Sequence, residues 1–211
     1  MLGGKRAIIF DFDGTLVDSE PLHARAWRET ALAAGFPPET PYLAAVGVAD
    51  EKVAARIVTD FKPRLDAAGL LSEKGRRFDE LSRGLQPVDG ARRLFELAKG
   101  RGLRLAVASN GPASYVHPIL RGCGLFPFLE AVACGDEVPR HKPAPDLYLL
   151  ACRRLGLPPD ACVAVEDSVD GVGSAAAAGL ACIALAVSFA PAELSGAQRI
   201  LPRLSAVVDL L

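Results

Sequence analysis

Two aspartates separated by one residue, Asp11 and Asp13, follow a short apolar run at residues 7–10. Side chains alternate along an extended chain, so both carboxylates are expected to point the same way. Like charges held that close repel unless a cation lies between them or one is protonated. Gly14 follows and permits a sharp turn or a close approach to a ligand. The pair therefore predicts either a cation-binding catalytic site or an ordinary acidic turn.

Two further polar clusters also come directly after apolar runs. Ser109-Asn110 follows residues 103–108, and Glu166-Asp167 follows residues 162–165. Each cluster alone is equally explained as a turn that begins a helix. An open parallel sheet, however, binds ligands beyond the carboxyl ends of its strands, so we expect the three clusters to converge.

Convergence of four carboxylates would require a cation, and an all-oxygen ligand set suits Mg²⁺, which also bridges to phosphates. A bound phosphate further needs hydroxyl or amide donors and a fixed positive charge. Ser109 and Asn110 offer the donors, and Lys142 offers the charge. We expect Lys142 to precede directly a helix that begins at Pro143.

The elements that must position these residues alternate between strands and helices. Apolar runs typical of buried strands occur at residues 7–10, 103–108, 131–134, 162–165 and 182–185. Helical patterns of 10 to 15 residues separate the last four, which indicates right-handed βαβ units and a parallel sheet. Only helical patterns occur over residues 17–86. We predict an α/β fold: a Rossmann-like parallel sheet core (residues 1–16 and 87–211) with a helical cap domain (residues 17–86) inserted after the first strand.

Composition excludes several function classes. Of the 211 residues, 50% are hydrophobic, and the net charge of −1 favours neither a nucleic-acid nor a membrane partner. The five cysteines are scattered without a metal-type pair, which is typical of reduced core thiols. The apolar run near the N-terminus is too short for a signal segment. We therefore expect a cytoplasmic protein, a monomer or weak dimer.

Four segments together resemble the haloacid dehalogenase-like (HAD) hydrolases. The string DFDGTLVDSE at residues 11–20 is similar to the first motif of that family. Ser109-Asn110, Lys142-Pro143 and Glu166-Asp167 resemble its second, third and fourth motifs, in the same order. The resemblance covers most of the chain.

The resemblance implies a role for each residue. Asp11 would be the nucleophile that becomes an aspartyl-phosphate, and Asp13 would protonate the leaving group and then activate water. Asp11 and Asp167 would bind Mg²⁺ through their side chains and Asp13 through its carbonyl. Glu166 would be a further ligand or would support the ligands from behind. Ser109 and Lys142 would neutralise the phosphate oxygens.

The position of the insertion resembles the branch with a helical C1-type cap, which includes phosphoglycolate phosphatase, sugar-phosphate phosphatases and β-phosphoglucomutase. In that branch His23 would lie close to the acid/base aspartate, and Lys74 would face the substrate. Two departures count against a mutase. Asp50, after Gly47-Val48-Ala49, stands where the mutase has an arginine for the second phosphate, and the turn Asn110-Gly111-Pro112 is short.

These patterns predict a Mg²⁺-dependent phosphatase acting on a small phosphorylated metabolite, of a sugar-phosphate kind. A sugar-phosphate mutase and a non-catalytic binding protein on the same fold are the alternatives. A competing pattern, G-x-G-x-x-A at residues 171–176, matches a dinucleotide fingerprint. Five residues separate it from the preceding strand, so we interpret it as small residues that pack a helix on the sheet.

Overall fold

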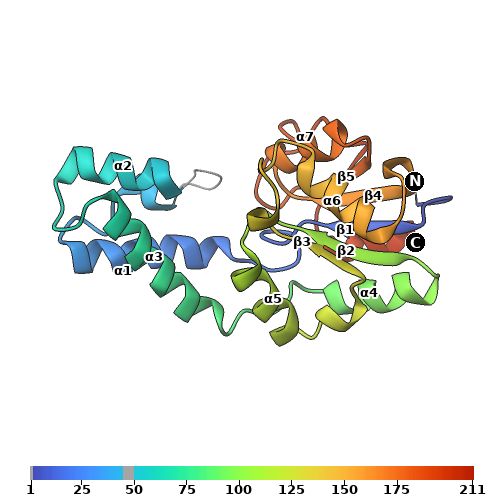
Figure 1. Ribbon diagram of the computed structural model, residues 1–211, viewed down its shortest axis with the longest axis horizontal. Helices are drawn as coiled ribbons and strands as arrows, with labels where there is room; N and C mark the ends of the chain where they lie inside the picture. Colours follow the sequence, from blue (N-terminus) through green and yellow to red (C-terminus); the bar gives the residue numbers. More distant parts are fainter. Residues whose placement is uncertain (1, 45–49) are drawn as a thin grey trace. The chain divides into compact units, whose positions relative to one another are not determined.

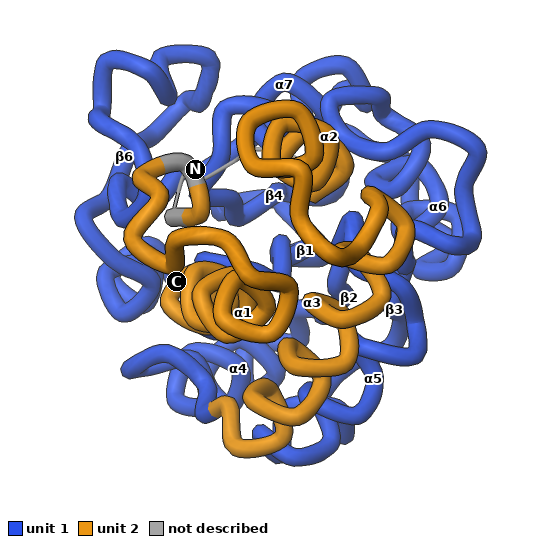
Figure 2. Tube along the Cα trace, turned by 90° about the vertical axis from the view of Figure 1, so that its left-hand side faces the viewer, with its two compact units in different colours: residues 1–18, 86–211 blue, residues 19–85 orange. Residues whose placement is uncertain are grey.

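The chain forms two compact units in a computed structural model that describes residues 2–44 and 50–211. Residues 1–18 and 86–211 make up the first, which we call the core unit, and residues 19–85 make up the second, the helical unit (Figure 2). The segment Gly47-Val48-Ala49, which precedes Asp50 in the motif that departs from the mutases, lies outside the described residues.

The core unit is built on a parallel sheet of six strands in the order β3-β2-β1-β4-β5-β6. The strands are β1 (Ala7–Phe10), β2 (Arg104–Ala108), β3 (Ala131–Ala133), β4 (Cys162–Glu166), β5 (Ala181–Leu185) and β6 (Arg199–Leu201). The chain builds β2 and β3 on one side of β1 and then places β4 on the other. The strand order therefore reverses beside β1, where open α/β sheets bind ligands. The predicted fold class is confirmed.

The strands next to β1 are hydrophobic because both faces of the sheet are covered. All four residues of β1 are buried. Figure 1 shows α6 (Asp146–Leu155) and α7 (Val169–Ala177) on one face, and α4 (Ala91–Gly100) and α5 (Ala113–Gly122) on the other. Ile9 packs in one cluster with residues of α6 and α7, whereas the ring of Phe10 contacts Phe95 of α4. Successive side chains of β1 thus pack against the helices on opposite faces of the sheet.

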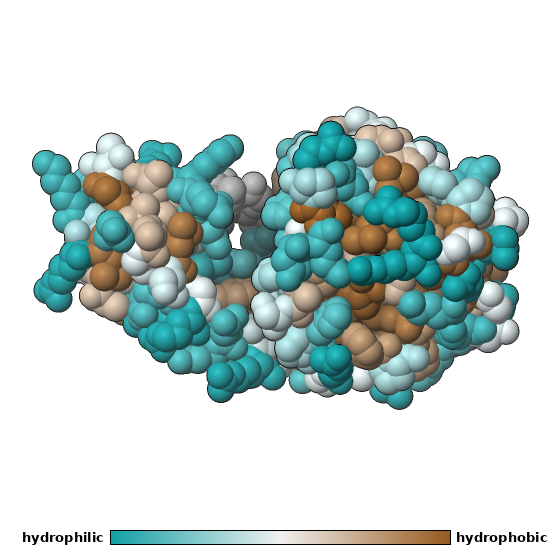
Figure 3. Space-filling view, in the orientation of Figure 1, coloured by the Kyte–Doolittle hydropathy of each residue, from teal (hydrophilic) through white to brown (hydrophobic). Residues whose placement is uncertain are grey.

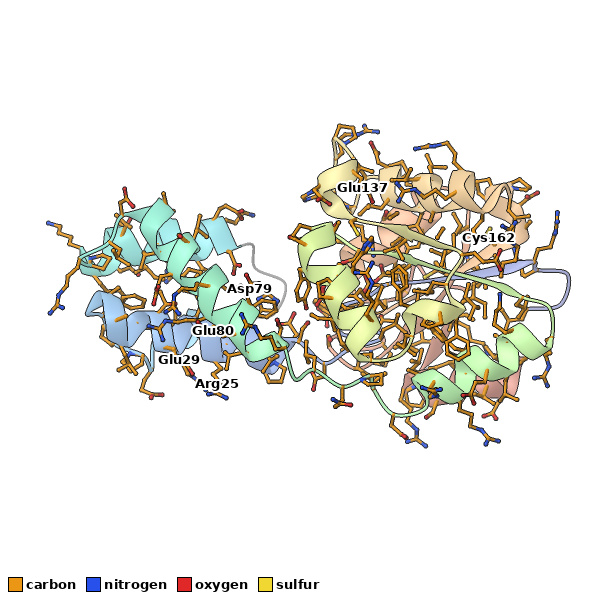
Figure 4. All side chains as sticks on the ribbon, turned by 60° about the horizontal axis from the view of Figure 1, so that its bottom comes forward. Arg25, Glu29, Asp79, Glu80, Glu137 and Cys162 are labelled. Atoms are coloured by element: carbon orange, nitrogen blue, oxygen red, sulfur yellow. The ribbon has the colours of Figure 1, made fainter. Side chains whose placement is uncertain are left out.

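Short 3-10 helices complete the core unit: Phe126–Phe128, Gly135–Glu137, Pro159–Ala161 and Leu204–Leu210. All five cysteines are buried thiols outside any disulfide, including Cys162 at the start of β4 (Figure 4).

The helical unit contains α1 (Glu20–Ala34), a 3-10 helix (Pro41–Ala44), α2 (Asp50–Phe61) and α3 (Ala67–Ser82). Gly35 ends α1 with a left-handed φ of 82°, and Asp66 caps α3 by accepting a hydrogen bond from Gly69 N. The hydrophobic core of the helical unit includes Trp27 of α1, Ile57 of α2 and Leu70 of α3. Within α1, Arg25 and Glu29 form an ion pair one turn apart (Figure 4).

Two details of the predicted fold are wrong. The sequence patterns did not indicate β6, because three half-exposed or exposed residues at a sheet edge carry little hydrophobic signal. The helix expected from Pro143 begins only at Asp146. Pro145 disfavours a helical conformation at Ala144, which instead closes a turn by donating to His141 O. Lys142 therefore does not lie directly before a helix.

Hydrophilic residues are spread over the visible face of both units (Figure 3). None of the helices in the described ranges is long and apolar enough to cross a membrane.

Candidate active site

Three buried carboxylates meet at the carboxyl ends of β1 and β4. Phe10 and Val165 are paired in register, so Asp11 after β1 lies beside Glu166 and Asp167. Ligand oxygens of the three acids all lie within 4.8 Å of one another. The three residues are nearly excluded from solvent, with Asp11 at 8%, Asp167 at 4% and Glu166 at 0% exposure.

Lys142 brings a buried positive charge into this cluster. Its Nζ donates to Asp11 Oδ1 and to Glu166 Oε1, both at 2.6 Å, and to Ala108 O at 2.9 Å. An ammonium has three protons to donate, so these contacts use its full donor capacity. The backbone N of Lys142 donates to Asn110 Oδ1 at 3.0 Å. The amide of Asn110 thus holds the loop that delivers the lysine.

Glu137, which is labelled in Figure 4, anchors the segment that follows β3. Glu137 accepts a hydrogen bond from Cys134 N and forms an ion pair with Arg154 of α6. These contacts tie the segment after β3 to the helix that follows Lys142.

Glu166 is surrounded by protein donors. Its Oε1 accepts from Lys142 and from the hydroxyl of Tyr148, at 2.9 Å. Its Oε2 accepts from the backbone N of Asp167 and from both the N and Oγ of Ser168. Five donors approach the roughly four lone-pair sites of a carboxylate. This geometry suits a residue that supports the site from behind better than a direct metal ligand.

Two glycines lie so close to the carboxylates that a side chain at either position would overlap with an acid. A Cβ on Gly171 would lie 1.9 Å from Glu166 Cδ, and a Cβ on Gly14 would lie 2.2 Å from Asp167 Oδ2. Neither position accepts a side chain without displacing an acid. Gly171, the first glycine of the G-x-G-x-x-A pattern, therefore serves the acidic cluster.

Asp167 is oriented by two hydroxyl groups. Ser188 Oγ donates to Asp167 Oδ2 at 2.7 Å, and Thr15 Oγ1 donates to Asp167 Oδ1 at 3.3 Å. Burial raises the pKa of Asp167 to about 6, although these hydroxyl groups oppose the shift. Glu166 adds to the increase by repulsion.

The cluster is short of positive charge. Burial raises the pKa of Asp11, and Lys142 only partly offsets this effect while the two neighbouring acids reinforce it. Burial would lower the pKa of Lys142, but Asp11 and Glu166 outweigh burial and raise it. Three clustered carboxylates thus face one ammonium. This all-oxygen set with excess negative charge fits a hard divalent cation such as Mg²⁺.

Asp13 and Ser109 flank the cluster. Asp13 is half-buried, and its Oδ1 accepts from the hydroxyl of Tyr115 at 2.7 Å. Ser109, at the end of β2, is 1% exposed, and its Oγ accepts from Gly111 N at 3.0 Å. Accepting that bond leaves the hydroxyl proton of Ser109 available for donation.

The two predicted residues of the helical unit contact each other. Lys74 Nζ lies 2.7 Å from His23 Nδ1 and 2.6 Å from Asp50 Oδ2, and the lysine is 4% exposed. The His23 ring stacks on Phe78, and Trp27 Nε1 donates to the other oxygen of Asp50. Asp50 therefore neutralises Lys74 within this unit. That His23 and Lys74 face a substrate stays a prediction.

Side chains that contact the predicted acids but were missed from the sequence include those of Thr15, Tyr115, Tyr148 and Ser188. Ser188 follows β5, so the rule that polar residues cluster at strand ends could have found it. Tyr148 is fully buried within α6 and carries no local signal of its hydroxyl contact.

Comparison with known proteins agrees with this geometry. Residues 5–179 match the family model described as haloacid dehalogenase-like hydrolase. Protein CbbY of Rhodobacter capsulatus is 38% identical over 83% of this chain and 82% of its own length. Fructose-1-phosphate phosphatase YqaB of Escherichia coli is 33% identical over 82% of this chain and 92% of its own. A crystal structure of CbbY from Rhodobacter sphaeroides in complex with xylulose-(1,5)bisphosphate superposes with a TM-score of 0.80, at 34% identity and 95% coverage of both chains.

The chain belongs to the haloacid dehalogenase-like hydrolases, which confirms the predicted family. Within that family its relatives include named phosphatases, and the predicted enzyme class, a phosphoric monoester hydrolase, is confirmed as well.

Proposed function

We propose that this protein is a Mg²⁺-dependent phosphatase that hydrolyses a small, sugar-phosphate-like metabolite through an aspartyl-phosphate on Asp11. The observation that carries the proposal is the buried contact of Asp11 with Lys142 inside an acidic cluster at the strand-order reversal. A nucleophilic carboxylate, a fixed cation and metal-type oxygen ligands are the parts that phosphoryl transfer requires.

The side chains of Asp11 and Asp167, with the carbonyl of Asp13, would hold the metal. Glu166 would fix Lys142 and the backbone of Asp167 through two of its five hydrogen bonds. When bound, Mg²⁺ supplies positive charge against the phosphate oxygens.

The protein groups then divide the reaction into two displacements. The Asp11 carboxylate forms a bond to phosphorus while the bond from phosphorus to the leaving oxygen breaks, and the Asp13 carboxyl gives its proton to that oxygen. In the second step Asp13 takes a proton from water, which attacks phosphorus and releases inorganic phosphate from Asp11. Lys142 and the hydroxyl of Ser109 stabilise the charge on the transferred group.

Three relatives support a sugar-like organic part. Their names are fructose-1-phosphate phosphatase, phosphorylated carbohydrates phosphatase and hexitol phosphatase A, and they are 33 to 34% identical to this chain. We propose that the helical unit acts as the cap that excludes bulk water and contacts the sugar, with His23 and Lys74 as the contacting residues.

A mutase would need a second subsite for the phosphate that is not transferred, usually with a spare arginine or lysine. In the helical unit the buried Lys74 is already paired with Asp50 at 2.6 Å. A second dianionic group would therefore meet a neutral pair, which favours hydrolysis over transfer to a second sugar position.

The test is a time course with purified protein, Mg²⁺, β-glucose 1-phosphate and a bisphosphate primer. We expect release of inorganic phosphate without accumulation of glucose 6-phosphate. Faster formation of glucose 6-phosphate than of phosphate would identify a mutase. No turnover of this substrate, of p-nitrophenyl phosphate or of a panel of sugar phosphates would identify a binding protein.

A further inference from the structure

We infer that Tyr115 positions the Asp13 carboxyl for proton transfer. The inference rests on the proposed function, in which Asp13 is the general acid and base. Tyr115 lies in the first turn of α5, and its hydroxyl donates to Asp13 Oδ1 at 2.7 Å across 102 residues of sequence. Both residues belong to the core unit, so the contact is internal to one compact body.

The tyrosine ring is itself held in place. It meets the ring of Phe12 edge to face, with centroids 5.6 Å apart and an interplanar angle of 77°. Gly111 borders its other side, because a Cβ there would lie 2.9 Å from Tyr115 Cδ1. The backbone N of Tyr115 donates to Pro112 O. The short turn of residues 110–112 thus holds the Tyr115 ring in place and fixes the direction of its hydroxyl.

The hydrogen bond from Tyr115 holds Asp13 in one orientation, which proton transfer requires. A general acid must lie within hydrogen-bond reach of the oxygen that it protonates, in one orientation. Asp13 sits on a turn just before Gly14, whose φ is 80°, and its side chain is half-buried. A hydrogen bond to a carboxylate is shorter and stronger than one between neutral groups, so Tyr115 narrows the rotamers of Asp13. A carboxylate retains capacity for further partners when it accepts one such bond.

The test compares Tyr115→Phe with the unmodified enzyme on two substrates with different leaving groups. An alkoxide leaves only with a proton from Asp13, whereas p-nitrophenolate leaves readily without one. We expect kcat/KM for fructose 1-phosphate to fall about tenfold, and kcat/KM for p-nitrophenyl phosphate to fall less than about threefold. Equal losses on both substrates would show a general structural defect and would overturn the inference.

A second measurement uses Asp13→Asn as the background. If Tyr115 acts through Asp13, adding Tyr115→Phe to that variant leaves the rate of p-nitrophenolate release in the first turnover, in which Asp11 is phosphorylated, unchanged. A further loss equal to that in the unmodified enzyme would contradict the inference. Ser114→Ala, an exposed neighbour on α5, is the matched control and should leave both activities unchanged.

The two possible failures are distinguishable. An active enzyme whose kcat/KM values are unaffected by Tyr115→Phe refutes the role of Tyr115 alone. An unmodified enzyme with no activity that depends on Asp11 refutes the proposed function, and the role of Tyr115 with it.

Discussion

The ammonium of Lys142 lies 2.6 Å from the carboxylate of Asp11, although 131 residues separate them in the chain. Lys142 is also 2.6 Å from Glu166, and all three side chains are almost fully buried. Charges held this far from water are costly unless each is matched, so this contact links the stability of the core unit to its proposed chemistry.

Replacing Lys142 should therefore destabilise the protein strongly. We expect Lys142→Met to lower the free energy of unfolding by about 3–5 kcal/mol, because two buried carboxylates lose their cation. Urea denaturation without metal at neutral pH measures this change. The matched control is Lys99→Met, since Lys99 pairs with Glu130 at the surface and such pairs contribute about 0–1 kcal/mol. Similar losses for both variants would show that the Lys142 pair is not a buried charge contact.

The raised pKa of Asp167 predicts how the stability of the metal-free protein depends on pH. Its pKa of about 6 in the folded protein exceeds the usual 3.8, so the folded state binds more protons between those values. Stability without metal should fall as pH rises from about 4 to 6, by about 3 kcal/mol for this group. Asp11 contributes in the same direction.

Thermal unfolding in EDTA across that pH range checks this trend. Asp167→Asn should flatten the slope, and added Mg²⁺ at pH 7 should restore stability to the unmodified protein. If stability depends on pH as steeply in Asp167→Asn as in the unmodified protein, the raised pKa of this carboxyl is not the cause of the trend.

Activity should require Mg²⁺, with Ca²⁺ a poor substitute. Calcium accepts more ligands at longer and looser distances than magnesium, which weakens alignment of the attacking carboxylate with phosphorus. Phosphate release is measured after EDTA treatment and again after addition of each metal. Full turnover in excess EDTA would contradict a metal role for the acidic cluster.

Much of the core unit could be predicted from local sequence patterns. The run at residues 7–10 is buried on both sides, and polar clusters follow β1, β2 and β4, so topology alone brought Asp11, Ser109 and Glu166 to one edge of the sheet. Strand β6 could not be predicted because its three residues are half-exposed or exposed and carry little hydrophobic signal. The start of α6 at Asp146 depends on Pro145 as well as Pro143, because a proline disfavours a helical conformation in the residue before it.

The contacts around the acids depended on information that sequence patterns do not carry. The hydroxyl groups of Tyr115, Tyr148 and Ser188 reach their carboxylates across 18 to 102 residues. Nothing in the local sequence of the two tyrosines distinguishes them from ordinary buried or surface residues, whereas Ser188 follows β5 and could have been found from its place after a strand. Likewise, the pairing of Lys74 with Asp50 depends on how α2 and α3 pack, which spacing along the chain does not fix.

In the proposed mechanism, Asp11 carries the phosphoryl group during turnover. Asp13→Ala retains the nucleophile and the metal ligands but lacks the base that activates water. A substrate with a good leaving group, p-nitrophenyl phosphate, should therefore phosphorylate this variant and leave it trapped. The matched control is Asp11→Asn, which has nearly the same volume at the nucleophile but an unreactive amide.

The most direct measurement is mass spectrometry of the peptide that contains Asp11, after acid quenching of Asp13→Ala with p-nitrophenyl phosphate and Mg²⁺. We expect the added mass of one phosphoryl group on Asp11, and none in the Asp11→Asn control, which should also be folded and inactive. An unphosphorylated Asp11 in Asp13→Ala, together with appreciable phosphatase activity in folded Asp11→Asn, would contradict the account.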